Sequence, residues 1–525
     1  MSLFRYFALG LLSFLMAPFV FCVDMSAKGC KGAFKEKVMY VDFRNEIHTI
    51  DALKGLAERV AADGFTCMML EYEATFPFEK HATIQNRYAY TKEEIQDYVA
   101  FCDKLGLEVI PLQNCMGHMQ YILRHDRYAA LREDKADMSQ VCPLKIKEAV
   151  PVFKEIFAEV AALHPSKYFH IGCDETFLLG SCKKCAAYAQ EHGKSKLFVE
   201  YVKAMCQIVL DMGKIPIIWA DIILKYPENL GELPKELIYL DWNYGWDVNK
   251  FGKISNLIDA KVNLWGGSSL RSSPDDIYLT QWEKHFNNLR DYVPFARKSG
   301  YQGMVQTSWS TSGAYSYSYG PRNEVLEIYP IRSVYPESGF NILLAATAWA
   351  YNHQEPLEPR TFVYDYAKEK FGFDESACET LWAYFTMPQE QVTARNGKDV
   401  KGRPIKDVLA DAYAMKERLS ALRSSANKVE IEHYKLMLDI RINYLEFKQC
   451  ESEFESKNYE ISQRAALAER VSKICKEGKK LDKRFEKLNK SYLKPGQIGY
   501  IQDSRGAKME ALLRTLTYDD SKINR

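Results

Sequence analysis

The sequence has almost no net charge, because 70 lysine and arginine residues nearly balance 69 aspartate and glutamate residues and leave +1. A chain of this kind lacks the basic field that attracts nucleic acid, and it has no acidic tail. We therefore expect no nucleic-acid partner. At 525 residues the chain is too long for one ordinary domain core, so we expect one large domain and an addition to it.

Long apolar runs are absent beyond the first residues. The chain begins MSLFRYFALGLLSFLMAPFVFCVD, in which a single basic residue, Arg5, precedes an uncharged apolar run. This pattern is typical of a secretory leader that is cut after Cys22. An uncleaved anchor is the alternative, because the run approaches the roughly 18 residues that span a bilayer. We expect a signal peptide at residues 1–22, a secreted or periplasmic protein, and no membrane contact after cleavage.

The thirteen cysteines lack the arrangement of a disulfide framework. Most of them stand singly in hydrophobic runs, as Cys67 and Cys102 do, which is typical of small core residues. The exception is CKKC, with Cys182 and Cys185. A zinc site usually needs a second pair at a matching distance, and the sequence shows none. A disulfide and a structural metal both stay open for this pair, and we expect no metal in the chemistry and no cofactor.

Short hydrophobic runs alternate with longer amphipathic ones along the first part of the chain. The segments between the runs have helical patterns, for example TKEEIQDYVAFCDKLG, which opens on a Thr cap with acids in its first turn. Eight strand and helix units favour a closed parallel (β/α)8 TIM barrel over a doubly wound sheet. The candidate strands are residues 38–43, 67–71, 107–112, 168–171, 215–219, 237–242, 262–265 and 303–309.

A second region follows the two prolines of EPLEPRTF, where the chain becomes strongly helical. KVEIEHYKLMLDIRINYLEFKQC, for example, has apolar residues at helical spacing with charges between them. We predict a TIM-barrel catalytic domain at residues 33–355 and a C-terminal helical domain at residues 360–525. The helical domain is expected to pack on the barrel, and the alternative is that it forms the interface of a homodimer.

Polar and aromatic residues recur directly after the predicted strands. Active sites of barrels of this class are built at the carboxyl ends of the strands, so we expect these residues to surround one site. A cup of aromatic rings with a few acids suits a pyranose, whose apolar face stacks on rings. The candidates are Arg44, Glu71, Glu73, His118, Asp174, Glu175, Trp219, Asp221, Trp242, Tyr244, Trp265 and Trp309.

The stretch YFHIGCDETFLLG leads a hydrophobic and aromatic run directly into Asp174 and Glu175. Charged residues are rarely fully buried unless they are paired or functional. Neighbouring carboxylates at one strand end are poorly placed to flank a sugar from both faces, as glycosidases with a protein nucleophile require. If Glu175 protonates the glycosidic oxygen, the nucleophile comes from another strand, from water or from the substrate.

HIGCDE is similar to the histidine, glycine, aspartate, glutamate signature of glycoside hydrolase family 20, the β-N-acetylhexosaminidases. The similarity extends over roughly residues 38–309, where LEYEATFPFE, LEVIPLQNCMGHMQYILRH, PIIWAD and LDWNY resemble the hexosaminidase D branch. The resemblance implies an exo-acting enzyme that releases terminal N-acetylglucosamine or N-acetylgalactosamine from glycans. It also implies substrate-assisted hydrolysis with retention, in which the substrate's own acetamide is the nucleophile.

The resemblance also implies roles for the matching residues. Glu175 would be the general acid and then the base that activates water. Asp174 would orient the 2-acetamido group and stabilise its developing positive charge, and Tyr244 would bond the acetamide oxygen. Trp219, Trp242 and Trp309 would form the walls of the pocket, and Arg44 would bind ring hydroxyls. His118 would support Glu175, with Glu71 or Glu73 behind it. Asp221 and Trp265 would be further substrate contacts.

Two other interpretations remain open. One is a metal-dependent barrel hydrolase or aldolase with His118, Glu71, Asp174 and Glu175 as ligands, although histidine is scarce at the predicted rim. The other is a non-catalytic sugar-binding protein, which the intact acidic pair opposes. The expected partner is a carbohydrate with a terminal N-acetylhexosamine.

Overall fold

The computed structural model describes residues 34–311, 333–393, 396–424 and 426–518. The predicted signal peptide at residues 1–22 lies outside these ranges and stays a prediction. In the described ranges, no helix combines the length and the apolar character that crossing a bilayer requires.

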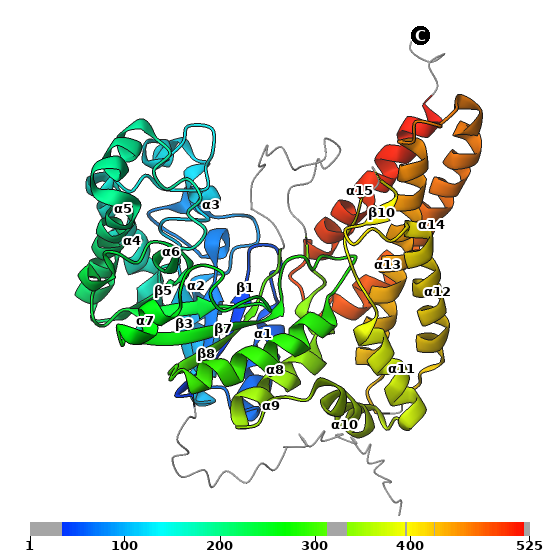
Figure 1. Ribbon diagram of the computed structural model, residues 1–525, viewed down its shortest axis with the longest axis horizontal. Helices are drawn as coiled ribbons and strands as arrows, with labels where there is room; N and C mark the ends of the chain where they lie inside the picture. Colours follow the sequence, from blue (N-terminus) through cyan, green and yellow to red (C-terminus); the bar gives the residue numbers. More distant parts are fainter. Residues whose placement is uncertain (1–33, 312–332, 394–395, 425, 519–525) are drawn as a thin grey trace, which may run out of the picture. The chain divides into compact units, whose positions relative to one another are not determined.

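Eight parallel strands close into a barrel in chain order (Figure 1). The barrel closes because β1 pairs with β2 on one side and with β8 on the other. All eight predicted strands are present, so the predicted TIM barrel is confirmed. The strands are β1 (Glu36–Asp42), β2 (Cys67–Glu71), β3 (Glu108–Leu112), β4 (Tyr168–His170), β5 (Ile215–Trp219), β6 (Ile238–Trp242), β7 (Asn263–Arg271) and β8 (Gly303–Ser308).

Helices connect and follow the strands. The α-helices are α1 (Ile50–Ala62), α2 (Lys92–Lys104), α3 (Gln120–Leu123), α4 (Ile146–Ala162), α5 (Lys183–Asp211), α6 (Asp221–Lys225), α7 (Ser255–Asp259), α8 (Trp282–Lys298) and α9 (Asn341–Asn352). Short 3-10 turns are η1 (Glu73–Thr75), η2 (Ala82–Ile84), η3 (Asp126–Leu131), η4 (Leu230–Glu232) and η5 (Glu337–Gly339).

The start of α2 shows how local sequence sets these elements. The Thr91 side chain accepts the backbone N–H of Glu94, and the Glu94 side chain accepts the backbone N–H of Thr91. This reciprocal pair satisfies two of the backbone donors that a helix start leaves free. The Thr cap predicted from TKEEI is confirmed.

The interior of the barrel is filled by apolar side chains from all eight strands. Alternate residues of a strand face the same side, so every second residue of a barrel strand points inward. The inner cluster consists of Val38, Tyr40, Cys67, Met69, Ile110, Leu112, Tyr168, Ile217, Trp219, Ile238, Leu240, Trp265 and Val305. The barrel is therefore a packed core, and chemistry is left to its rim.

Trp265 is one expected rim residue that the structure places elsewhere. The seventh strand was predicted to end at Trp265, and this boundary is wrong because β7 continues to Arg271. Trp265 lies near the start of β7 and packs edge-on against Tyr168, with ring centroids 5.0 Å apart. The expected role of Trp265 as a substrate contact loses its basis, since the side chain belongs to the amino-terminal end of the barrel core.

The C-terminal region is helical, as predicted. It contains α10 (Pro359–Phe371), α11 (Glu375–Thr386), α12 (Ile405–Ala421), α13 (Lys428–Phe454), α14 (Arg464–Asn489) and α15 (Gln497–Thr517), the 3-10 turn η6 (Ile461–Gln463), and a small sheet of β9 (Val392–Thr393) and β10 (Lys398–Asp399). Helices α12 to α15 pack one against the next (Figure 1).

The segment between α14 and α15 is hydrogen-bonded to the barrel. The backbone N–H of Thr49 donates to Tyr492 O at 2.9 Å, and the N–H of Lys494 donates to Ile47 O at 2.7 Å. The buried ring of His48 contacts Tyr492 with centroids 4.7 Å apart. These bonds attach the helical region to the chain just after β1. The predicted domain limits at residues 355 and 360, and the homodimer, stay predictions.

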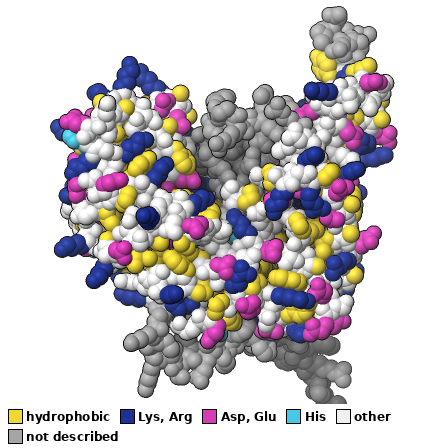
Figure 2. Space-filling model, in the orientation of Figure 1, with side chains coloured by type: hydrophobic (Ala, Val, Ile, Leu, Met, Phe, Trp, Pro, Cys, Tyr) yellow, Lys and Arg dark blue, Asp and Glu magenta, His cyan; other side chains and the backbone are white. Residues whose placement is uncertain are grey.

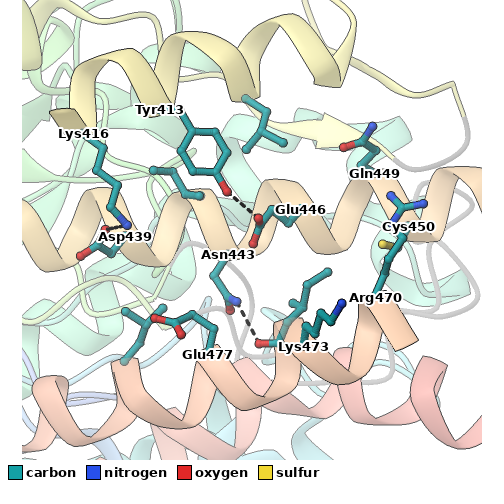
Figure 3. Close-up of a pocket in the computed structure, with 14 residues that line it drawn as sticks. Tyr413, Lys416, Asp439, Asn443, Glu446, Gln449, Cys450, Arg470, Lys473 and Glu477 are labelled. Atoms are coloured by element: carbon teal, nitrogen blue, oxygen red, sulfur yellow. Dashed lines mark hydrogen bonds and ion pairs between the residues drawn. The ribbon is translucent and has the colours of Figure 1, made fainter. Parts of the chain in front are cut away.

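A pocket lies between α12, α13 and α14 (Figure 3). Its charged groups have partners inside or beside the pocket: Lys416 Nζ is 2.7 Å from Asp439 Oδ1, and Tyr413 Oη donates to Glu446 at 2.5 Å. Arg470, also at this pocket, pairs with Glu453. Paired surface charges of this kind are ordinary features of helical bundles and provide no acid or base poised for chemistry.

Positive and negative side chains are interspersed on the visible face of the molecule (Figure 2). This distribution agrees with the near-zero net charge. The described residues on this face therefore offer no continuous basic stripe to a phosphate backbone.

Candidate active site

The acidic pair lies just beyond the end of β4. Asp174 is buried, whereas 39% of the Glu175 side chain is exposed. The turn that delivers them is shaped by His170, whose Nδ1 accepts the N–H of Gly172 at 2.9 Å. Burial lowers the pKa of His170 to about 3, so this ring is neutral and can act as an acceptor. The histidine of HIGCDE therefore stabilises the turn, and the two acids remain available for a ligand.

His118 joins the two acids. Its Nε2 is 3.1 Å from Asp174 Oδ2 and 3.4 Å from Glu175 Oε2. Burial alone would lower the pKa of His118, but the charge and hydrogen bond of Asp174, with Glu175, raise it well above its ordinary value. In turn, burial raises the pKa of Asp174, and the His118 charge and hydrogen bond outweigh this and lower it. The site thus holds a histidinium against an ionised aspartate.

Only one carboxylate oxygen of Asp174, Oδ2, interacts with His118. Oδ1 is buried and has no hydrogen-bond partner among the described residues. A buried carboxylate oxygen without a partner is unfavourable by about 1–3 kcal/mol or more, so such an atom is informative about function. Asp174 Oδ1 can accept a hydrogen bond from a ligand N–H.

Two glycines allow the β3 and β4 loops to approach each other at the pair. A Cβ on Gly117 would lie 2.1 Å from Asp174 O, and one on Gly172 would lie 2.0 Å from Asn114 Oδ1. Both distances are too short for any other residue. Both residues of the GH pair in CMGH therefore have a role. Gly117 lets the β3 loop approach the Asp174 backbone closely, and His118 forms a hydrogen bond with the Asp174 side chain.

Backbone strain is concentrated at this rim. Five non-glycine residues of the described chain have positive φ: Glu73 at 44°, His118 at 55°, Cys173 at 78°, Glu175 at 47° and Lys261 at 53°. All but Lys261 follow β2, β3 or β4. Such conformations are unfavourable by on the order of 1–3 kcal/mol each and cluster where a site must hold side chains in fixed directions.

The first two strands contribute a charged group around Arg44. Arg44 Nε donates to Asp42 Oδ1 at 3.1 Å and is 3.9 Å from Glu73 Oε1. Glu71 accepts from Tyr40 Oη and from Asn114 Nδ2, the latter at 2.7 Å. Glu71 is thereby occupied within the protein, and Arg44 is oriented by Asp42.

Glu73 is the less constrained of the two glutamates. Its carboxylate oxygens are buried and have no hydrogen-bond partner among the described residues. Burial raises the pKa of Glu73 well above its ordinary value, although the charge of Arg44 opposes this. The structure shows no hydrogen bond from His118 to Glu71 or Glu73, so either glutamate can act on His118 only through its charge.

Aromatic rings cover the site from β1, β5, β6 and β8. Trp309 lies 5.8 Å from Trp219 and 4.9 Å from Tyr40, measured between ring centroids, and the Arg44 guanidinium lies over its face at 4.8 Å. Trp309 Nε1 donates to Tyr244 Oη at 2.9 Å. Because Tyr244 accepts this bond, its own hydroxyl hydrogen is free to donate to a ligand.

Trp242 lies in a second aromatic cluster that follows β6. Its ring is 5.2 Å from Tyr244, 5.3 Å from Trp246 and 4.5 Å from Phe251. Lys250 Nζ lies 3.5 Å from the Trp246 ring centroid. Trp246 and Lys250 were missed by the sequence analysis, because they lie in a loop beyond the strand end that guided the prediction.

Asp221 holds the backbone of the general-acid candidate. Its Oδ2 accepts the N–H of Glu175 at 3.0 Å. Burial, and then the negative charge of Asp174, raise the pKa of Asp221 to about 8. Asp221 is thus largely protonated at neutral pH and adds little negative charge beside Asp174.

Asp42, the carboxylate that orients Arg44, was also missed by the sequence analysis. It is the last residue of β1 and could have been found as the acid that ends the strand before Arg44.

The family comparison covers most of the barrel sequence. The model of the glycosyl hydrolase family 20 catalytic domain matches residues 58–289. Residues 58–289 of this chain are therefore similar to the catalytic domain of that family. The family predicted from HIGCDE is confirmed, and the matched segment includes Glu73, His118, Asp174, Glu175 and Tyr244.

Two of the relatives that the chain resembles are named hexosaminidase D. Hexosaminidase D of Bos taurus is 26% identical over 290 residues, which cover 52% of this chain and 84% of the relative. Hexosaminidase D of Homo sapiens is 26% identical over 304 residues, covering 54% of this chain and 62% of the relative, so the chain spans less than two thirds of the human protein. A solved β-N-acetylhexosaminidase from Bacteroides fragilis NCTC 9343 has 16% identity and a TM-score of 0.49 over 64% of this chain and 69% of that one.

Proposed function

We propose that this chain is an exo-acting β-N-acetylhexosaminidase that releases terminal N-acetylglucosamine or N-acetylgalactosamine from glycans. The observation that carries the proposal is the pair of acids with different surroundings at the end of β4. Asp174 is buried, ionised and bound to His118, whereas Glu175 is partly exposed. The family match and the hexosaminidase relatives support the same activity.

In the first step the acetamide oxygen of the substrate attacks C1 of its own sugar, and the bond from C1 to the glycosidic oxygen breaks. Glu175 gives its proton to the leaving oxygen. Asp174 Oδ1 accepts the acetamide N–H and stabilises the positive charge of the cyclic intermediate, while Tyr244 Oη donates to the acetamide oxygen. The unpartnered Oδ1 and the free hydroxyl hydrogen match these two demands.

In the second step water attacks C1 from the face that the leaving group has vacated. Glu175, now ionised, takes a proton from this water, and the C1 bond to the acetamide oxygen breaks. Two inversions at C1 give net retention. His118 interacts with both acids, so its charge can compensate the negative charge that Glu175 acquires between the two steps.

Two alternatives were left open by the sequence. A metal-dependent hydrolase would use His118, Glu71, Asp174 and Glu175 together, but Glu71 is occupied by Tyr40 and Asn114. A binding protein without activity would not require Glu175 to be strained and partly exposed beside His118. Neither the family match nor the relatives support these alternatives.

Turnover of chromogenic glycosides tests the activity. We expect the purified full-length chain to release the aryl group from aryl N-acetyl-β-glucosaminide or N-acetyl-β-galactosaminide, in the presence of a strong chelator as well as in its absence. Binding without turnover would identify a sugar-binding protein. Turnover abolished by the chelator and restored by a divalent metal, with the thermal midpoint unchanged, would instead favour the metal-dependent hydrolase, because loss of a structural metal would lower that midpoint.

Asp174→Asn is expected to lower kcat by about 10²- to 10³-fold, because the lost charge acts on a cation that exists only in the transition state and the intermediate. Folding should change little, since asparagine keeps the shape and His118 can release its proton when its partner is neutral. The measurements are kcat, the thermal midpoint and an NMR titration of His118.

The pKa of His118 should fall in this variant, because burial then acts on the ring without the opposing carboxylate charge. Asp97→Asn is the matched control, since Asp97 is exposed and pairs with Lys54 on the surface. If Asp174→Asn kept its activity while the thermal midpoint fell strongly, Asp174 would be a structural residue.

We also propose export to a secreted or periplasmic location through the leader at residues 1–22. The support is the apolar run behind Arg5 and the cleavage pattern at Cys22. N-terminal sequencing of the protein recovered outside the cytoplasm should begin at Val23. Recovery of the uncleaved chain in the membrane fraction would favour the anchor.

A further inference from the structure

Four side chains that can bind a metal meet where two loops of the barrel come together. Glu133 and Cys142 belong to the connection from β3 to α4, and Cys182 and Cys185 belong to the start of α5. Their ligand atoms, three sulfurs and one carboxylate oxygen, all lie within 4.8 Å of one another. Glu133, Cys142 and Cys185 are buried, and Cys182 is partly exposed.

The spacing of the sulfurs is that of a metal shell. Cys142 Sγ and Cys185 Sγ are 3.5 Å apart, whereas a disulfide requires about 2.05 Å. Zinc binds thiolate sulfur at about 2.3 Å, which places two sulfurs of a tetrahedron about 3.8 Å apart. Cys185 Sγ is also 3.3 Å from Glu133 Oε2, so the carboxylate oxygen can be the fourth ligand beside the three sulfurs.

The backbone around the group is arranged for anionic ligands. Cys182 is the N-cap of α5, and its Sγ accepts the backbone N–H of Cys185 at 3.4 Å. Glu133 Oε1 accepts the N–H of Cys182 at 2.9 Å. Backbone N–H groups thus orient both the Cys182 sulfur and the Glu133 carboxylate. This leaves Glu133 Oε2 and the three sulfurs directed at one another.

We propose that Cys142, Cys182, Cys185 and Glu133 form a structural zinc site. Three thiolates and one carboxylate in a tetrahedral group suit Zn²⁺ better than the harder Mg²⁺ or Ca²⁺, which prefer oxygen ligands. With four protein ligands the metal has no open position, so it stabilises the fold and takes no part in hydrolysis. Binding displaces the thiol protons to solvent.

The site would fasten together the two loops that carry the catalytic residues. The hairpin at residues 131–142 is bonded to the His118 loop through Val141 N to Met116 O and Met119 N to Ser139 O, both at 3.0 Å. Cys182 and Cys185 lie at the far end of the loop that begins with Asp174 and Glu175. A metal between these segments would hold His118 and the acids in register.

Metal analysis of the full-length chain tests the inference without reference to activity. The protein is produced with zinc in the medium and purified under reducing conditions without chelator. We expect about one zinc per chain by mass spectrometry of the metal, and below about 0.1 in Cys185→Ser. Replacement of zinc by Co²⁺ should give the intense visible bands of tetrahedral cobalt bound to thiolates.

Cys206→Ser is the matched control, because Cys206 is a buried cysteine of the same helix outside the group. It should keep about one zinc. Glu133→Gln preserves all three thiolates and should weaken zinc binding by at least about tenfold in competition with a chromophoric chelator. The cobalt spectrum of the wild-type chain decides the question even if Cys185→Ser fails to fold.

The inference would be overturned by a wild-type chain that takes up no zinc and gives no tetrahedral cobalt spectrum. Peptide mapping without reduction supplies a second decisive result. A bond between Cys142 and Cys185, or between Cys182 and Cys185, in protein from its native location would assign the group as a redox pair or a structural disulfide.

Discussion

An aryl β-glucoside should be hydrolysed about 10⁴-fold or more slowly than the corresponding N-acetyl-β-glucosaminide, because an internal nucleophile supplies an effective molarity of about 10⁵–10⁸ M. Exchanging the 2-acetamido group for a hydroxyl removes the attacking oxygen. It also removes the groups that meet Asp174 Oδ1 and Tyr244 Oη. The measurement is kcat/KM on matched pairs of aryl glycosides, with either the gluco or the galacto configuration.

Stereochemistry and inhibition complete this test. The first-formed sugar should have the β configuration by NMR, and a thiazoline that mimics the cyclic intermediate should inhibit competitively. Comparable rates on the plain glucoside, or an α product, would contradict the acetamide as nucleophile. The search would then move to a carboxylate from another strand, for which Glu73 is the candidate because its oxygens have no hydrogen-bond partner among the described residues.

Glu175→Gln should lower kcat/KM on natural glycans by about 10²- to 10⁴-fold while leaving substrate binding intact, because it removes the proton donor to the leaving oxygen. The loss should shrink on substrates whose leaving phenol is very acidic, since such a group departs without protonation. The measurement is kcat/KM over a series of aryl leaving groups of increasing pKa.

Glu191→Gln provides the control, because Glu191 is an exposed glutamate of α5. The kcat/KM of the wild-type enzyme and of Glu191→Gln should vary weakly with the pKa of the leaving group. The kcat/KM of Glu175→Gln should fall steeply as that pKa rises. Equal losses on good and poor leaving groups would assign the proton donor to another residue. Asp221 would be the first to examine, since its raised pKa of about 8 lets it carry a proton at neutral pH.

The acids owe their separate behaviour to their neighbours. His118 lies within 3.4 Å of both, but Asp174 is buried against it and Glu175 is partly exposed. Asp221 fixes the Glu175 backbone without adding a full charge at neutral pH. Asp174 is therefore stabilised as an anion, while Glu175 is exposed to a ligand, and the proposed reaction needs two acids in such different surroundings.

Local patterns were sufficient for most of the barrel. The eight strands were predictable because buried strands are short apolar runs, and the start of α2 was predictable because a Thr cap is bonded within its own turn. The acidic pair was found because it directly follows a strand. Where a strand end was misjudged the site prediction lost its basis, as for Trp265, which shares the apolar character of the core and gives no sign of how far β7 continues.

The sequence by itself determined the fold class, the helical C-terminal region and the position of Asp174 and Glu175 at one strand end, because each depends on residues close together in the chain. Only the tertiary structure decided which atoms meet. In the folded barrel, His118 contacts both acids, and Asp42 forms an ion pair with Arg44. Glu133 and Cys142 likewise lie close to Cys182 and Cys185 of CKKC. These contacts depend on how separate loops converge, and no local period of the sequence encodes a distance between loops.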